Sequence, residues 1–105
     1  MQDNVTIVVI GRNEEKNLHS AFQAINEMNY PREKIETIYV DTESSDNSFD
    51  IACQYADKVY EMKTGWPTAG LARNKGLIEA KHNIIHFIDG DIRIDPNYLK
   101  HAVNK

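Results

Sequence analysis

The chain has 105 residues, 41% of them hydrophobic, and a formal net charge of −4. This length suits one domain, residues 1–105, in which helices cover a sheet. The scattered basic residues exclude the positive surface of a nucleic-acid-binding protein, and neither a secretory signal nor a membrane-spanning segment is expected.

Apolar runs that resemble strands alternate with helical patterns. Residues 5–10 are rich in β-branched side chains and predict a buried central strand. Asn13 is placed to cap the next helix, whose apolar side chains recur every three or four residues, at Leu18, Ala21, Phe22, Ile25 and Met28. Residues 35–40 predict a second strand that ends at Asp41.

A polar turn over residues 42–47 precedes the second helix, and we interpret Ser44 and Ser45 as supporting this turn or a helix cap. The helix has four small or apolar side chains on one face, at Phe49, Ala52, Cys53 and Ala56. The single cysteine, Cys53, is interpreted as a core residue and suits a reducing compartment.

Residues 58–62 predict a weaker third strand, and the glycine and proline of residues 63–67 indicate a loop. Thr68 can cap a third helix, whose apolar positions are Leu71, Ala72 and Ile78. Gly76 in this helix indicates close packing against a strand or ligand, or a helix end. Residues 83–88 predict the fourth strand, with His86 in the core, and a last helix opens at Asp95 and Pro96.

This alternation predicts an α/β fold in three layers, with helices on both faces of a parallel sheet. Ligands bind such sheets at the carboxyl ends of the strands. Three polar clusters follow strands here, at residues 11–14, at Asp41 and at residues 89–91. We therefore expect them to meet at one end of the sheet.

The two carboxylates of Asp89 and Asp91 flank Gly90 at the end of a buried strand. In an extended segment they point to the same side, and their desolvation is costly unless a positive group neutralises them. A divalent metal with a phosphorylated ligand is the simplest such group. An ordinary solvated turn is the alternative.

Four segments, taken in order, resemble the motifs of the family 2 glycosyltransferases: residues 9–15, 40–48, 72–76 and 87–91. The resemblance extends from about Val5 to Leu99. It implies the Rossmann-like, nucleotide-sugar-binding half of a GT-A type fold, with four strands in the order 3-2-1-4. Residues 42–43 depart from the family pattern, because Glu43 stands where a glycine is common.

The resemblance assigns seven residues to the nucleotide sugar, namely Arg12, Asn13, Glu14, Asp41, Arg73, Asn74 and Asp89. It assigns Asp91 to a Mg²⁺ or Mn²⁺ ion that bridges the two phosphates. Structural roles remain open for several of them: a helix cap for Asn13, a turn for Asp41, an exposed helix position for Arg73, and a hydrogen-bonded helix position for Asn74.

By resemblance, the chain is the donor-binding domain of a metal-dependent, inverting glycosyltransferase, with a UDP-sugar as the expected donor. The acceptor can be a sugar, lipid or protein, and the catalytic base is expected beyond Lys105, because the chain is interpreted as truncated. A cytoplasmic location is expected. A position of the full-length protein at the cytoplasmic face of a membrane stays open, as does a homo-oligomer.

Two other functions compete with this interpretation. A noncatalytic nucleotide-binding or interaction domain has the same fold. A receiver-like phosphoacceptor module requires an acidic pair after the first strand, and Gly11, Arg12 and Asn13 do not provide one.

Overall fold

The computed structural model describes residues 3–62 and 69–89. The elements in chain order are β1 (Val5–Gly11), α1 (Glu15–Asn26), the short 3-10 helix η1 (Arg32–Lys34), β2 (Ile35–Asp41), α2 (Ser48–Tyr55), β3 (Lys58–Glu61), α3 (Ala69–Glu79) and β4 (Ile84–Asp89). The predictions for the loop over 63–67, for Thr68, for Asp91 and for a helix after Asp95 fall outside the described residues. Within them, no helix has the length and apolar character needed to span a membrane.

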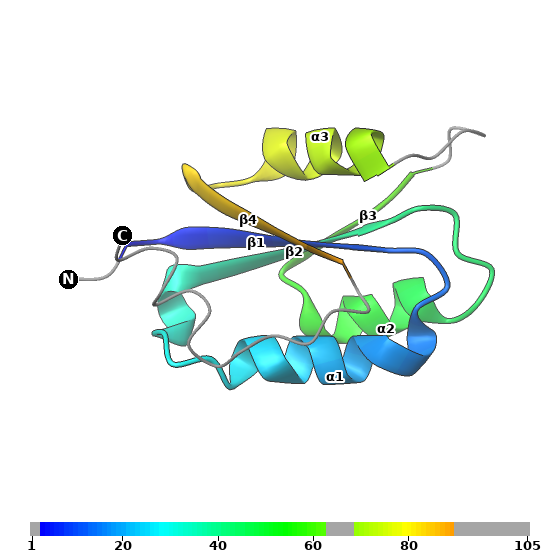
Figure 1. Cartoon of the computed structure of the whole chain (residues 1–105), viewed down its shortest axis with the longest axis horizontal. Helices are drawn as coiled ribbons and strands as arrows, with labels where there is room; N and C mark the ends of the chain where they lie inside the picture. The colour runs from blue at the N-terminus through cyan, green and yellow to red at the C-terminus, as the bar shows by residue number, and fades with distance from the viewer. Residues whose placement is uncertain (1–2, 63–68, 90–105) are drawn as a thin grey trace.

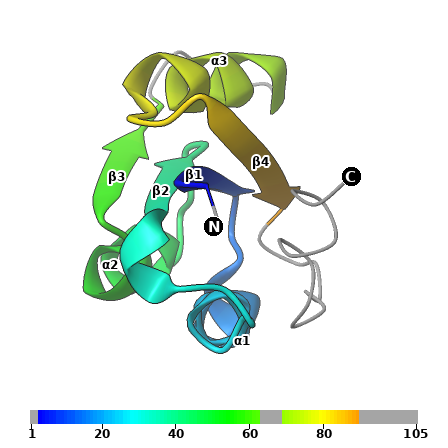
Figure 2. The ribbon, with the colours of Figure 1, turned by 90° about the vertical axis from the view of Figure 1, so that its left-hand side faces the viewer.

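The four strands form one sheet in the order β3-β2-β1-β4, and every neighbouring pair is parallel. Helices α1 and α2 lie on one face and α3 on the other, as two perpendicular views show (Figures 1 and 2). The predicted order and the three layers are confirmed. The register places Gly11 opposite Asp41, and Ile10 opposite Asp89.

The central strand β1 is buried along its whole length. Its side chains alternate, so that Val5, Ile7 and Val9 belong to the core under α1 and α2, whereas Val8 and Ile10 belong to the core under α3. The apolar side chains predicted for α1 are all buried.

The side of α3 that contacts the sheet is made of small residues. A Cβ atom on Gly76 would lie 2.5 Å from Val8 Cγ1, so the predicted close packing against a strand is confirmed. The prediction that Leu71 and Ile78 pack inward is wrong, because these side chains are 42% and 75% exposed. Ala72 and Gly76, one turn apart, face the sheet instead.

The prediction for Cys53 is also wrong, because its side chain is exposed. The buried residues of α2 are Ser48 and Ala52, four positions apart on the side of the helix that faces the sheet. Cys53 follows Ala52 by one residue, about 100° further around the helix. This rotation carries the thiol away from the core.

A buried glutamate ties the end of α3 to the amino ends of the strands. Glu36 Oε1 accepts hydrogen bonds from Thr6 Oγ1 and from the Lys81 N–H, both at 2.8 Å, and Oε2 lies 3.0 Å from Lys58 Nζ. Burial alone would raise the pKa of Glu36, but these donors outweigh it and hold the pKa below its ordinary value.

We expect Gly76→Ala to lower the free energy of unfolding by about 1–3 kcal/mol, because the new methyl group overlaps Val8. This loss exceeds the gain of about 1 kcal/mol in helix propensity. Urea denaturation measures the change. Gly70→Ala, at an exposed position of α3, is the control and should not destabilise the chain. Equal losses in both variants would contradict the contact.

We expect Glu36→Gln to cost about 1–3 kcal/mol of stability near neutral pH, because a carboxylate with three donors is lost. The folded pKa lies below the ordinary value of 4.5, so this contribution is present above that pH and disappears as the pH falls through the folded pKa. Urea midpoints of wild type and variant should therefore converge in acid. A gap that is constant with pH would refute the linkage, and Glu33→Gln, at an exposed position, is the control.

Candidate functional site

The loops that follow β1 and β2 meet at the carboxyl end of the sheet. Thr42 donates from N–H and from Oγ1 to the Gly11 carbonyl, at 3.0 and 3.1 Å. These bonds bring Arg12, Asn13 and Glu14 beside Asp41, and the backbone of Asp89 ends the neighbouring strand β4. The side chain of Asp89 and all of Asp91 lie outside the described part of the chain.

The N-terminus of α1 is capped by the turn that follows β2. Three consecutive N–H groups donate to side chains of that turn: Asn13 to Ser44 Oγ at 2.8 Å, Glu14 to Ser48 Oγ at 2.8 Å, and Glu15 to Asp46 Oδ2 at 3.3 Å. The first N–H groups of a helix have no partner within the helix itself. Here the turn provides those partners and thereby fixes the position of α1 relative to β2.

Asn13 has a different role from the helix cap that was predicted. Glu14 occupies the N-cap position, without a side-chain cap bond, so that prediction is wrong. Asn13 has a left-handed backbone, with φ 54°, and its Oδ1 accepts a hydrogen bond of 2.7 Å from the Ser45 N–H. Asparagine tolerates this conformation better than most residues do. Asn13 therefore joins the two loops.

Asp46 places a negative charge at the start of α1. Burial would raise the pKa of Asp46, but hydrogen bonds from Ser48 and from the Glu15 N–H outweigh it and hold the pKa below its ordinary value. In many nucleotide-binding folds this end of a helix binds a phosphate. Here the Asp46 carboxylate already takes that place.

Asp41 is fully buried, and its carboxylate accepts three hydrogen bonds. Tyr39 Oη and Ser44 Oγ donate to Oδ1 at 3.0 and 2.7 Å, and the Ser44 N–H donates to Oδ2 at 2.9 Å. Burial and the Asp41 charge raise the pKa of Tyr39, so its hydroxyl remains a donor. A carboxylate has about four acceptor positions, which leaves one on Oδ2.

Four other side chains make no polar contact with the described part of the chain. Arg12, Arg73 and Asn74 are exposed, and no described residue bonds to their side chains. Glu43 is half-buried, and its side chain also has no polar partner among the described residues. Its backbone is left-handed, with φ 56°. These side chains are available to a ligand.

Sequence reasoning missed the part that Tyr39, Asp46 and Ser48 play in fixing the loops. The signal was the hydroxyl-rich turn, in which Ser44 and Ser45 were predicted to support a turn or a cap. This prediction is confirmed, but Ser44 supports the loop that leads into α1: its Oγ accepts from the N–H of Asn13, 31 residues away, beside the caps that Ser48 and Asp46 provide. Nothing in a local pattern identifies a cap across that separation.

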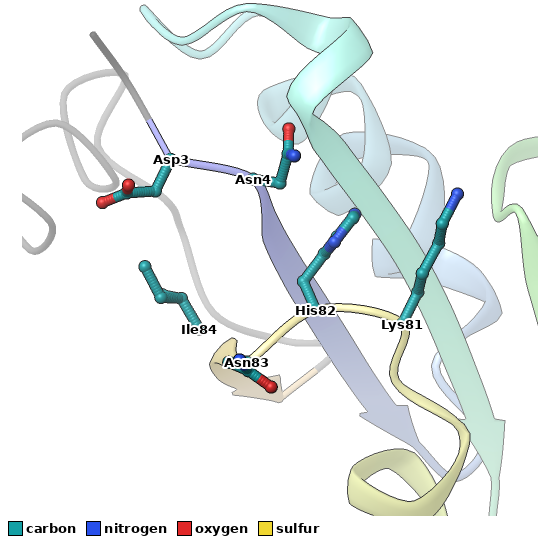
Figure 3. Close-up of a pocket in the computed structure, with 6 residues that line it drawn as sticks. All are labelled: Asp3, Asn4, Lys81, His82, Asn83 and Ile84. Carbon is teal, nitrogen blue, oxygen red and sulfur yellow. The ribbon is translucent and has the colours of Figure 1, made fainter.

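A separate hollow of about 320 Å³ lies at the opposite end of the sheet (Figure 3). Its lining residues are Asp3, Asn4, Lys81, His82, Asn83 and Ile84. None of the predicted donor-site residues is among them. The hollow is therefore separate from the convergence of loops at the carboxyl end.

The described residues contain no group of three or more histidine, cysteine, aspartate or glutamate side chains that could hold a metal ion. Asp41 and Asp46 are occupied by hydrogen bonds within the loops. Asp91, to which the resemblance assigns the metal, lies outside the described part of the chain.

Comparison with known proteins identifies one family. The model of the family described as Glycosyl transferase family 2 matches residues 6–105. The glycosyltransferase AglE of Haloferax volcanii is 26% identical over 104 residues, which make up 95% of this chain and 34% of AglE. The chain thus spans about a third of that relative.

Solved structures show the same fold. Mannosyltransferase PcManGT from Pyrobaculum calidifontis, in complex with GDP-Man and Mn²⁺, matches 98% of this chain and 32% of its own, with 25% identity and a TM-score of 0.86. TarS 1-349 of Staphylococcus aureus, in complex with UDP-GlcNAc, matches 96% of this chain and 30% of its own, with 25% identity and a TM-score of 0.83.

We expect Ser48→Ala to lower the free energy of unfolding by about 1–3 kcal/mol, because the buried Ser48 hydroxyl is the acceptor of the Glu14 N–H. Ser45→Ala is the matched control in the same turn, since its exposed hydroxyl makes only a 3.3 Å contact. It should change stability by less than about 0.5 kcal/mol. Chemical denaturation followed by circular dichroism measures both, and a stable Ser48→Ala variant would contradict the cross-capping.

Proposed function

This chain belongs to glycosyl transferase family 2, and from that premise we propose that it forms the donor-binding half of a glycosyltransferase. The proposed reaction moves a sugar from a nucleotide-diphosphosugar to an acceptor hydroxyl group. The observation that carries the proposal is the convergence of the ends of β1, β2 and β4, with the loop after β2 bonded to the loop after β1.

The likeness to PcManGT and TarS supports the nature of the ligand, because those structures hold GDP-Man with Mn²⁺ and UDP-GlcNAc. Ligands of parallel α/β sheets bind at the carboxyl ends of the strands, where these loops meet. We propose a UDP-sugar as the donor. The proposed donor site consists of Arg12, Asn13, Glu14, Asp41, Arg73, Asn74 and Asp89.

The charge of this end of the sheet supports a cation in the site. Asp46 lies at the start of α1, and Glu14 and Glu43 lie beside Asp41, whereas Arg12 is the basic residue of these two loops. A diphosphate that approaches so many carboxylates is repelled unless cations offset them. Arg12, Arg73 and a Mg²⁺ or Mn²⁺ ion on Asp91 are the proposed cations.

The proposed chemistry follows from the leaving group. Transfer of the sugar leaves a nucleoside diphosphate, whose negative charge grows as the glycosidic bond breaks. A divalent ion, when bound, stabilises that charge as a Lewis acid. The Arg73 guanidinium can pair with two phosphate oxygens through its planar fork. We assign acceptor activation, with inversion at the anomeric carbon, to a separate carboxylate of the full-length protein.

Isothermal titration calorimetry of UDP, with Mn²⁺ or with EDTA, tests the proposal. We expect binding with Mn²⁺ that weakens by at least about tenfold, or ~1.4 kcal/mol, when the metal is removed. Asp91→Asn should weaken binding to the same extent and abolish the effect of EDTA. Asp50→Asn, at an exposed position of α2, is the charge-matched control and should bind as wild type does.

Titration of GDP in parallel tests the choice of nucleoside, and tighter binding of UDP is expected. Absence of UDP binding in every condition would overturn the proposed function. Binding that is unaffected by EDTA and by Asp91→Asn would overturn the metal assignment alone.

A further inference from the structure

A directional chain of hydrogen bonds joins the two loops at the carboxyl end. The Asp41 carboxylate can only accept, so the Ser44 hydroxyl proton is donated to Asp41 Oδ1, at 2.7 Å. The Ser44 oxygen is then left to accept from the Asn13 N–H, at 2.8 Å. Bonds in such a chain polarise and strengthen one another.

The side chain of Asn13 adds a second connection between the same loops. Its Oδ1 accepts from the Ser45 N–H at 2.7 Å and contacts Ser45 Oγ at 3.3 Å. The acceptor atom of the amide group is thus directed at the turn. We call the set of contacts among Asn13, Ser44 and Ser45 the loop bridge.

The loop bridge joins two loops that each carry a side chain available to a ligand. Arg12 directly precedes Asn13, and Glu43 directly precedes Ser44. Neither makes a polar contact with the described residues, and Glu43 has a left-handed backbone conformation. Because the bridge bonds the two loops together, it fixes the separation of these side chains and the position of Asp41.

We propose that Asn13 belongs to the donor site as a positioning residue, as does Ser44: both act through the loop bridge, and the Asn13 side chain does not itself contact the nucleotide. This inference rests on the proposed function and assigns a task within the same site. Asn13 and Ser45 are exposed and add nothing to the core. The bridge therefore serves to preorganise the loops, which reduces the ordering that a ligand must otherwise bring about.

Three variants separate the roles of the Asn13 atoms. Asn13→Gly keeps the left-handed backbone and removes Oδ1, Asn13→Asp keeps the acceptor and removes the NH₂ donor, and Ser44→Ala removes the hydroxyl. We expect Asn13→Gly and Ser44→Ala each to weaken UDP binding by about three- to tenfold in calorimetry with Mn²⁺. Asn13→Asp should retain most of the affinity at high ionic strength, where its extra charge is screened.

The double variant gives a second criterion. If both residues act through one bridge, Asn13→Gly combined with Ser44→Ala should weaken binding by clearly less than the product of the single effects. Full additivity would mean that the two residues act independently, and a loss in Asn13→Asp as large as in Asn13→Gly would mean that Asn13 contacts the ligand through its NH₂ group. Either result would overturn the proposal. Asn47→Ala, at an exposed position of the same turn, is the control.

Amide hydrogen exchange of the ligand-free chain tests the bridge without the nucleotide. The Ser45 amide should exchange several times faster in Asn13→Gly than in wild type or Asn13→Asp, and unchanged exchange would overturn the bridge. If the wild-type chain binds no UDP, the proposed function fails, and the positioning role fails with it. The exchange rates then distinguish that outcome from the absence of the bridge itself.

Discussion

The cap that the turn after β2 provides for α1 is the interaction on which the rest of the site depends. Three N–H groups at the start of the helix donate to Ser44, Ser48 and Asp46, which belong to a different β-α connection. In an isolated βαβ unit, the first N–H groups of the helix bond to side chains of the loop that directly precedes it. In this chain two units share one set of hydrogen bonds, so the first loop cannot move without disturbing the second.

The shared hydrogen bonds also determine the charge at the start of α1. The positive end of α1 is already neutralised by Asp46, whose pKa is held low by the same contacts. A phosphate therefore gains little from the helix dipole, in contrast to the usual doubly wound dinucleotide fold. In the proposed function, charge compensation comes from side chains and ions that approach from other elements. The exposed Arg73 on α3 is such a group.

The fold was largely predictable because its signals are periodic. Buried β-branched runs specify strands, and the alternation with helices restricts the topology to parallel crossovers. The predictions failed where a shift of one residue around a helix decides which side chain is buried, or where a hydrogen-bond partner is distant in the sequence. Cys53 and Ile78 are apolar residues in helices, yet they lie outside the helix faces that pack on the sheet, which contain Ala52 and Gly76. The partners of Asn13 are 31 and 32 residues away, which no local pattern encodes.

The Glu36 cluster has a mechanical consequence for α3. Lys81 and Glu79, at the C-terminal end of the helix, are tied to Glu36, Lys58 and Tyr60 of the sheet. Arg73 lies six residues before Glu79, the last residue of α3, or roughly 9 Å along the axis at 1.5 Å per residue. The anchored end is the natural pivot, and a tilt of about 5° around it moves Arg73 by about 1 Å. The contacts of Glu36, Lys58 and Tyr60 thus influence the position of Arg73.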